Sequence, residues 1–160
     1  MDGDTAKARE KRPLKPFPHS LPANLMRARE AVMAHVRPVL RAYDVTEPQW
    51  RVLRTLSSVD EVEVTQLATM VFLLPSSLSR ILRDLGDRNL IQRRTAENDL
   101  RRGLVSISDK GMALIDAASP RAARVNVEIE TLFGPERMQA LLGMLSELEK
   151  SLGGPQAGDD

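Results

Sequence analysis

The sequence predicts a mainly helical fold that contains one small β hairpin. Three observations predict it: apolar residues recur at helical spacing over 75–88, two short apolar runs flank an Arg-rich tip over 90–107, and long apolar stripes follow the first and last expected helices. Aromatic residues make up only 3% of the 160 residues, which is typical of helical rather than sandwich proteins. A helix-turn-helix unit followed by such a hairpin is a winged helix-turn-helix, here with a dimerisation helix expected at each end.

The N-terminal part of the chain is expected to contain an arm and three helices. Residues 1–20 are basic and rich in proline without apolar periodicity, so we expect a flexible arm. A first helix is expected over about 21–43. Thr46 is expected to cap a second helix and Thr65 a third, which contains the run LATMVF over 67–72.

Residues 75–88 are expected to form a helix that reads DNA. Pro75 suits a first helical turn, and Asn89 can adopt the left-handed conformation that ends a helix. The apolar face consists of Leu78, Ile81, Leu82 and Leu85. The other faces carry the candidate DNA contacts Ser76, Ser77, Ser79, Arg80 and Arg83. Small hydroxyl residues let the backbone approach the major-groove floor, and arginine pairs with guanine edges or phosphate. The alternative is an ordinary surface helix with a solvated basic face.

The hairpin is expected to act as a wing, with strands over 90–94 and 104–107 and a polar tip over 96–103. Asp99 lies two residues before Arg101, close enough to orient its guanidinium group, and an oriented arginine fits the narrow minor groove of A·T-rich DNA. The candidate DNA contacts of the wing are Arg93, Arg94, Asp99, Arg101 and Arg102. The alternative is a solvated charged hairpin, although one directly after a Ser- and Arg-rich helix is uncommon by chance.

The C-terminal part is expected to form two helices and a disordered tail over 154–160. Ser108 is expected to cap the first helix, Pro120 to interrupt it, and Gly134 with Pro135 to separate it from the second. The apolar stripe of the last helix consists of Met138, Leu141, Leu142, Leu145, Leu148 and Leu152. A small winged core cannot bury this stripe together with that of the first helix, so we expect a twofold homodimer, with a monomer as the alternative. A dimer matches a pseudo-palindromic operator in double-stranded DNA, with half-sites roughly 10 base pairs apart.

Charge is divided along the chain although the net charge is only +1. Residues 76–103 hold seven arginines against four acids, whereas residues 128–160 hold two basic residues against seven acids. A basic face opposite an acidic end suits a protein that presents one side to phosphate.

Composition argues against several other classes of protein. The chain has no cysteine, its two histidines are too separated for a metal site, and it carries no phosphate loop or nucleophile motif. We therefore expect no catalytic residue, no metal and no cofactor. No apolar run approaches the length of a membrane span, and the N-terminus does not resemble a secretory signal. The expected location is the bacterial cytoplasm, on the nucleoid when the protein is bound to its operator.

Two motifs carry a resemblance to a known family. Asp-x-Arg-Arg at 99–102 in the wing and Ser-Asp-Lys-Gly at 108–111 make residues 20–153 resemble the MarR family of regulators. The segments LMRAREAVMAHVRPVL, which starts at Leu25, and TEPQWRVLRTL, which starts at Thr46, are similar to the branch that represses homoprotocatechuate (4-hydroxyphenylacetate) catabolism operons.

The resemblance implies how the chain is organised. It implies a winged helix-turn-helix over about 46–107 and dimerisation helices over about 21–43 and 108–153. The sequence departs from the family's pattern at three positions. Asn89 stands where glycine is usual, Asp84 stands where a basic residue is frequent, and Pro120 lies within a long helix.

The resemblance also implies an effector site where the dimerisation helices meet the winged-helix domain. The candidate ligand-binding residues are Arg29, His35, Trp50 and Arg54. An arginine beside an aromatic wall holds an aryl carboxylate by a bidentate salt bridge and stacking, and His35 is a candidate partner for a hydroxyl group. The alternatives are that Arg29 pairs with a structural carboxylate such as Glu30 or Glu47, and that Trp50 belongs to the core.

Together these patterns favour a homodimeric DNA-binding regulator. The expected function is repression of an aromatic-compound catabolism operon, with release by a small aromatic carboxylate. One alternative is a winged-helix regulator of an efflux or stress operon with no aromatic-acid ligand. Another is a winged-helix module that only contacts proteins, which explains the fold but not the Arg-rich wing.

Overall fold

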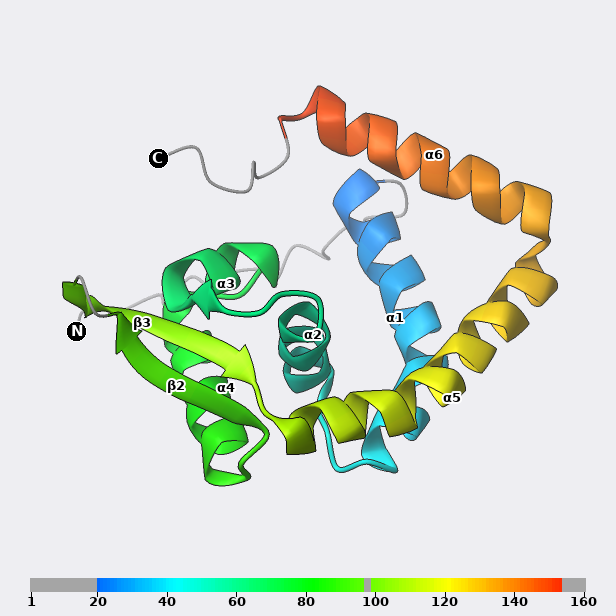
Figure 1. The fold of residues 1–160 in the computed structure, drawn as a ribbon. Helices are drawn as coiled ribbons and strands as arrows, with labels where there is room; N and C mark the ends of the chain where they lie inside the picture. The colour runs from blue at the N-terminus through cyan, green and yellow to red at the C-terminus, as the bar shows by residue number, and fades with distance from the viewer. Residues whose placement is uncertain (1–19, 97–98, 154–160) are drawn as a thin grey trace, which may run out of the picture.

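The computed structural model describes residues 20–96 and 99–153, without the side chains of residues 100 and 101. The described residues form six helices and three short strands (Figure 1), which confirms the mainly helical fold with a small wing. The elements are α1 (Leu21–Arg41), α2 (Glu47–Leu56), β1 (Val62–Glu63), α3 (Val64–Met70), α4 (Pro75–Asp87), β2 (Ile91–Ala96), β3 (Asp99–Ile107), α5 (Asp109–Phe133) and α6 (Pro135–Ser151). The expected flexible arm, the outermost part of the wing tip and the expected disordered tail lie outside the described residues.

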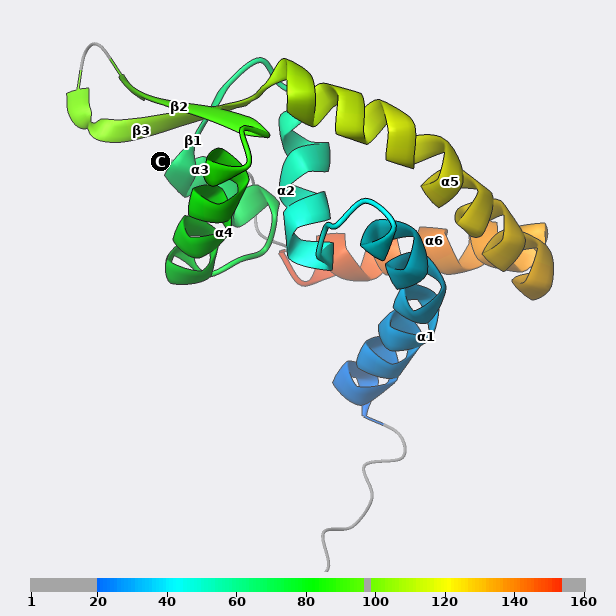
Figure 2. The same cartoon turned by 90° about the horizontal axis from the view of Figure 1, so that it is seen from below.

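The elements divide into two groups. The segment from α2 to β3 forms what we call the winged-helix body, and α1, α5 and α6 form a frame beside it (Figures 1 and 2). Helix α5 leads from the end of β3 to the corner where α6 begins, and the β2–β3 hairpin extends from the body at the opposite end.

The core lies inside the winged-helix body. Leu78, Leu82 and Leu85 of α4 have no exposed surface, and neither do Val52, Leu53 and Leu56 of α2. The apolar face expected for the DNA-reading helix is therefore the face that packs on the body. Since burying one such side chain contributes about 1.5–3 kcal/mol, these residues fix the position of α4 against α2.

The junction between α1 and α2 confirms one predicted cap and shortens one predicted helix. Helix α1 ends at Arg41 rather than near residue 43, because the chain turns there and Asp44 has a φ of 53°. Thr46 caps α2 as predicted: its hydroxyl oxygen accepts from the Gln49 N–H at 3.4 Å, and its own N–H donates to the Gln49 side-chain oxygen at 2.7 Å.

Strand β1 was not predicted, and it changes the start of the next helix. Its two residues pair with β3, Val62 opposite Val105 and Glu63 opposite Leu104. Helix α3 follows directly, with Glu63 in the cap position, so the prediction that Thr65 caps this helix is wrong. The chain enters α3 straight from a strand, which places Thr65 inside the first helical turn.

The wing has longer strands and a shorter tip than predicted. Strand β2 begins at Ile91, while Leu90 is a buried anchor between α4 and the wing. Strand β3 already begins at Asp99, opposite Ala96, so residues 99–103 belong to the strand and not to the tip. Continued backbone pairing past Leu104 toward the tip accounts for the difference, with an irregularity between Thr95 and Ala96.

Helix α5 has the predicted start and end but not the predicted interruption. The hydroxyl oxygen of Ser108 accepts from the Gly111 N–H at 3.0 Å, and Gly134, with a φ of 98°, separates α5 from α6. Pro120 lies within one continuous helix, so the prediction that it breaks α5 is wrong. A proline inside a helix removes one backbone donor, and the packing of α5 on α1 and α2 maintains the helix around it.

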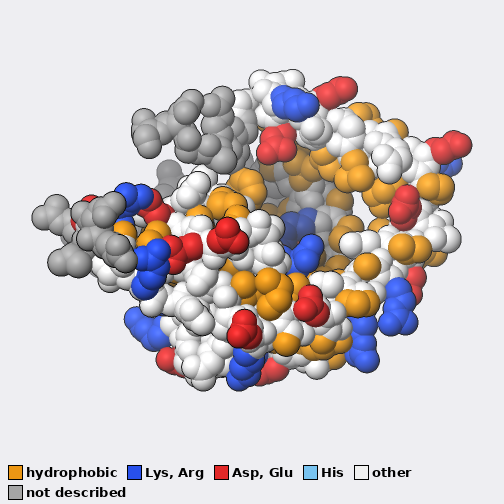
Figure 3. Space-filling model, in the orientation of Figure 1, with side chains coloured by type: hydrophobic (Ala, Val, Ile, Leu, Met, Phe, Trp, Pro, Cys, Tyr) orange, Lys and Arg blue, Asp and Glu red, His pale blue; other side chains and the backbone are white. Residues whose placement is uncertain are grey.

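The frame exposes many large apolar side chains. No residue of α6 is buried in the described chain, and Figure 3 shows hydrophobic side chains on the side of α6 that faces a central hollow. The most exposed large apolar residues of the frame are Leu21, Met26, Val127, Leu132, Leu142 and Met144, and Leu152 directly after α6 is exposed as well. None of the described helices is long and apolar enough to cross a membrane.

Candidate nucleic-acid interface and ligand pocket

The outer face of α4 presents the residues predicted to contact DNA. Ser76, Ser77, Ser79, Arg80 and Arg83 are all exposed. Within residues 20–96 and 99–153, neither Arg80 nor Arg83 forms an ion pair. Helix α4 packs against β2, so the helix and the wing lie next to each other (Figure 2). The arrangement suits a helix in the major groove with a hairpin beside it.

The polar residue at the end of α4 that departs from the family's pattern has a structural role. Asp84 accepts a hydrogen bond from the Gln49 side-chain amide at 2.6 Å and lies 3.6 Å from Arg88. Arg88 in turn donates to the backbone oxygen of Asp44 at 2.8 Å. Asp84 thus connects the recognition helix to the N-terminal turn of α2 and to the end of α1.

The turn from α4 into the wing is held by backbone and side-chain contacts. Asn89 has a φ of 57°, which confirms that it ends α4 in the left-handed conformation usually taken by glycine. The Ser108 hydroxyl donates to the Asn89 backbone oxygen at 2.7 Å, and Lys110 donates to that of Arg88 at 2.8 Å. The start of α5 therefore fixes the position of the wing relative to α4.

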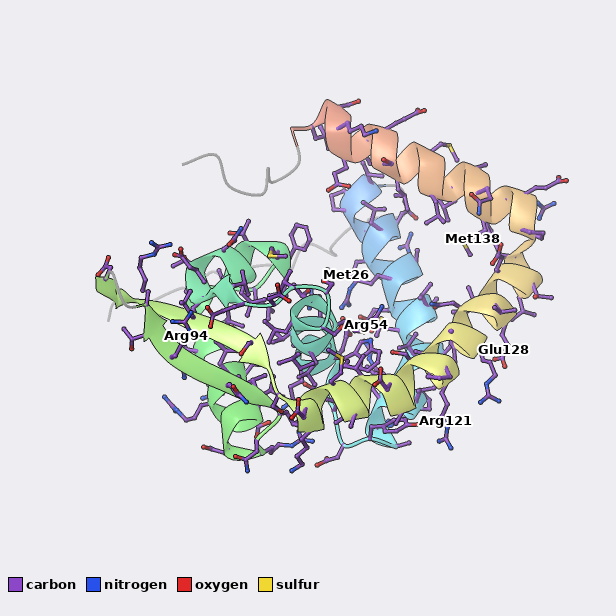
Figure 4. The ribbon with its side chains drawn as sticks, viewed as in Figure 1. Met26, Arg54, Arg94, Arg121, Glu128 and Met138 are labelled. Atoms are coloured by element: carbon purple, nitrogen blue, oxygen red, sulfur yellow. The ribbon has the colours of Figure 1, made fainter. Side chains whose placement is uncertain are left out.

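The wing arginines fall into different environments. Arg94 forms a bidentate pair with Glu61, with distances of 2.7 Å from Nε and 2.5 Å from Nη2 (Figure 4 labels Arg94 on the wing). Arg102 pairs with Glu63. Arg93 is exposed, and the side chain of Arg101 lies outside the described part. Asp99 is exposed at the start of β3. Arg94 and Arg102, both predicted DNA contacts, are therefore already paired with carboxylates inside the protein.

A cavity of about 530 Å³ opens between α1 and α2. Met33 and Val36 come from α1, and α2 together with the turn after it contributes Glu47, Trp50, Arg51, Arg54, Thr55 and Ser58. Figure 3 shows Lys or Arg side chains inside the hollow between the body and the frame, and Figure 4 places Arg54 in the space between α2 and α1. The lining combines apolar walls with a few polar groups, as expected of a small-molecule site.

Arg51 is the residue of this cavity that sequence reasoning missed. Its Nε atom is buried and has no hydrogen-bond partner among the described residues. Burial lowers the pKa of the Arg51 guanidinium, and the nearby charge of Arg29 lowers that pKa further. The available signal was its position one turn after Glu47 on α2, which places both residues on the side facing α1.

Of the four predicted ligand residues, the structure brings two to the cavity. Trp50 and Arg54 line it, and Trp50 also packs against the core of the body. His35 is exposed on α1 and is not part of the lining, and neither is Arg29.

Arg29 pairs with structural carboxylates, which was the alternative to its binding a ligand. It pairs with Glu30 at 2.9 Å and also with Glu47. Arg37 joins the same cluster, 2.7 Å from Glu30 and 3.7 Å from Glu47. The hydrogen bond from Arg37 lowers the pKa of Glu30, so this carboxylate is held in its charged form. The cluster ties α1 to the first turn of α2 at the edge of the cavity.

Comparisons with known proteins agree on one family. The model of the MarR family matches residues 45–102. The chain is 34% identical over 128 residues to the homoprotocatechuate degradative operon repressor of Escherichia coli, an alignment that covers 80% of this chain and 86% of the relative.

Two solved structures extend this agreement to the fold. The transcriptional regulator PA4135 superposes with a TM-score of 0.79 at 36% identity, over 82% of this chain and 97% of that one. NadR in complex with 4-hydroxyphenylacetate superposes with a TM-score of 0.71 at 31% identity, over 87% and 99% of the two chains. The chain has this fold, exposes a recognition helix and a wing, and aligns over most of its length with a regulator of similar length. It therefore belongs to the MarR family of DNA-binding transcriptional regulators.

Proposed function

We propose that this regulator represses an operon for the catabolism of an aromatic compound, and that a small aromatic carboxylate releases it from DNA. The observation that carries the proposal is the buried Arg51 Nε, which has no partner within the described residues, beside Trp50 in an otherwise largely apolar cavity. A carboxylate supplies the missing acceptor, and an aryl ring packs against the indole and Met33.

The relatives support the class of ligand and of operon. One regulates a homoprotocatechuate operon by its name, and NadR was crystallised with 4-hydroxyphenylacetate. Both molecules combine an aromatic ring with a carboxylate. Of the predicted ligand residues, Trp50 and Arg54 are proposed to contact the effector directly. Arg29 and His35 remain predicted ligand residues, and Arg29, which pairs with Glu47, is proposed to act through that carboxylate.

Thermal-shift measurements with a panel of aromatic carboxylates test this function. A ligand that binds only the native protein stabilises it by about 2.7 kcal/mol at a hundredfold excess over its dissociation constant. An aromatic carboxylate that stabilises the protein and releases operator DNA supports the proposal. If no member of the panel does either, the regulator instead serves an efflux or stress operon with another signal.

The proposed assembly is a homodimer on a pseudo-palindromic operator in double-stranded DNA. Met26 of α1, Leu142 of α6 and Leu152 directly after α6 are exposed large apolar side chains. Large exposed apolar patches are rare on monomers and mark interaction surfaces. We propose that residues 21–153 form the working unit, with dimerisation helices on either side of the winged helix-turn-helix. The protein is proposed to act in the bacterial cytoplasm and to have no catalytic activity.

The proposed DNA contacts are the exposed face of α4 and the wing, including Arg93 and the Asp99–Arg101 pair. Arg80→Ala is expected to weaken binding to an operator selected from a random duplex library by about 1–3 kcal/mol if Arg80 reads a base, and to spare random duplex. If Arg80 holds phosphate, both DNAs lose affinity equally. Anisotropy titrations with both duplexes distinguish these roles.

The matched control for Arg80 is Arg137→Ala, which removes the same charge from an exposed position on α6. It is expected to change neither affinity. Equal affinities of Arg80→Ala and Arg137→Ala for both duplexes would remove Arg80 from the proposed interface.

The contact from Gln49 to Asp84 offers a route from the effector to the DNA. An effector acts only if it binds the DNA-incompetent form more tightly, so it must move the recognition helices. It binds on α2, and Gln49 at the start of α2 bonds Asp84 on α4 at 2.6 Å. Asp84→Ala is expected to retain effector binding but to reduce the release of operator DNA at saturating effector. Full release by this variant would show that coupling takes another path.

A further inference from the structure

The outer face of the wing carries two internal ion pairs that DNA binding has to compete with. Backbone pairing places Glu63 opposite Leu104, and Leu104 opposite Arg94. Since alternate strand residues share a face, Glu61, Arg94 and Arg102 lie on the same side as Glu63. The opposite side holds Val62, Val105 and Ile91, which are buried in the core. The charged side is therefore the outer side of the sheet.

Both pairs join residues far apart in sequence, and the pair of Arg94 with Glu61 is bidentate. Arg94 meets Glu61 through Nε and Nη2, at 2.7 and 2.5 Å, in the fork-to-carboxylate arrangement that orients an arginine most strongly. Arg102 pairs with Glu63. The carboxylate side chains are the more shielded partners, 26% and 27% exposed, whereas the arginine side chains are 54% and 51% exposed.

Both arginines belong to the wing, which the proposed function brings against DNA phosphate. Affinity for DNA of any sequence depends on how many phosphates the basic side chains neutralise, because each neutralised phosphate releases counter-ions. A carboxylate already bound to an arginine is a fixed counter-ion that a phosphate must displace. In the free protein each of these two arginines is already matched by one carboxylate on the described part of this face.

We propose that Glu61 and Glu63 are internal competitors of DNA phosphate for Arg94 and Arg102, and that they limit sequence-independent binding. Phosphate contacts carry no sequence information, so lowering their contribution leaves recognition to α4 and the tip of the wing. The two glutamates come from the turn before β1 and from β1 itself, so this two-residue strand serves to place both carboxylates beside the wing.

Neutralising one carboxylate tests the competition directly. Glu61→Gln keeps the size of the side chain and removes its charge. Binding is measured by anisotropy with a fluorescein-labelled duplex of random sequence over a series of KCl concentrations. We expect affinity to rise by about 1.5- to 5-fold, the strength of one exposed ion pair. The slope of log K against log salt is expected to steepen by about 0.9, as one more phosphate is neutralised.

The neighbouring residue supplies a matched control. Asp60 is exposed, lies beside Glu61, and forms no ion pair with any residue in the described ranges. Asp60→Asn changes the net charge by the same amount at nearly the same distance from the DNA. The gain from Glu61→Gln must exceed the gain from Asp60→Asn, because only the former frees an arginine.

A double-mutant cycle then shows whether Glu61 acts through Arg94. In an Arg94→Ala background, Glu61→Gln is expected to give no more than the gain from Asp60→Asn. The Glu63→Gln and Arg102→Ala variants form a second, independent cycle with the same expectation. It decides the question if Glu61→Gln alters folding, which circular dichroism and melting curves report.

Three results overturn the proposal. If the Glu61→Gln and Glu63→Gln variants bind random duplex no better than the Asp60→Asn variant, the carboxylates do not compete with phosphate. Weaker binding by correctly folded variants shows that the pairs hold the wing in its binding shape instead. An undiminished gain in the Arg94→Ala and Arg102→Ala backgrounds shows a general charge effect that does not pass through these arginines.

Discussion

Replacing Arg51 by methionine is expected to weaken effector binding by about 10- to 100-fold while operator binding persists. Methionine fills a similar volume in the cavity but offers no donor to a carboxylate. Hydrogen bonds to charged groups contribute about 1.5–3 kcal/mol each, and Arg51 is the lining residue with a buried Nε that has no partner in the described chain. Calorimetric titration with the aromatic carboxylate that best stabilises the wild-type protein measures the loss.

Arg29→Met is the comparison that makes this result specific. Arg29 pairs with Glu30 and Glu47, so its replacement removes the same charge close to the cavity without removing a free donor. We expect a smaller loss of effector affinity from Arg29→Met than from Arg51→Met. The reverse order, or unchanged effector affinity in Arg51→Met, would show that the carboxylate of the effector does not bind Arg51.

The features that could be predicted from the sequence are those that depend on residues within about one turn of the chain. The caps at Thr46 and Ser108, the start of α4 at Pro75 and the left-handed Asn89 all depend on residues within a few positions of each other, and all are confirmed. Strand β1 was not predicted because two residues are too few to show a periodicity. They form a strand only because they pair with β3, some forty residues away in sequence.

Long-range contacts also explain the errors in detail. Pro120 does not break α5 because that helix is held by packing on α1 and α2, against which the loss of one backbone hydrogen bond is small. The strands of the wing continue to Asp99 because they pair with each other, although the intervening residues look like a polar tip. In both cases tertiary contacts outweigh local preference.

The candidate site was only partly predictable for the same reason. Periodicity alone placed Ser76, Arg80 and Arg83 on the exposed face of α4. It did not reveal that Arg94 pairs with Glu61 across 33 positions, because the register of a three-stranded sheet decides that contact. Arg51 could not be predicted as a lining residue, because the cavity depends on how α1 crosses α2.

Replacing Gly111 by alanine is expected to destabilise the protein by about 3 kcal/mol, at the upper end of the range for overpacking. Gly111 lies in the first turn of α5, where a Cβ atom would overlap the backbone oxygen of Leu90 and lie 2.8 Å from Ile107 Cγ1. The Leu90 oxygen cannot move freely, because it accepts a hydrogen bond from the Ser108 N–H at 3.1 Å. The clash therefore displaces the start of α5 from the base of the wing.

Gly86→Ala is the control for this prediction. A Cβ at Gly86, near the end of α4, meets nothing within 4 Å, so alanine there is expected to be neutral or to stabilise by up to about 1 kcal/mol through its helix propensity. Melting curves at one fixed protein concentration compare the variants, since each kcal/mol shifts the midpoint by about 2–4 °C in a chain of this size. Because the contacts of Ser108 and Lys110 also position the wing, Gly111→Ala is expected to lose operator affinity below its melting range. If the Gly111→Ala and Gly86→Ala proteins have equal melting midpoints, the backbone at the junction between the wing and α5 can move to accommodate the added Cβ atom, which would contradict the prediction.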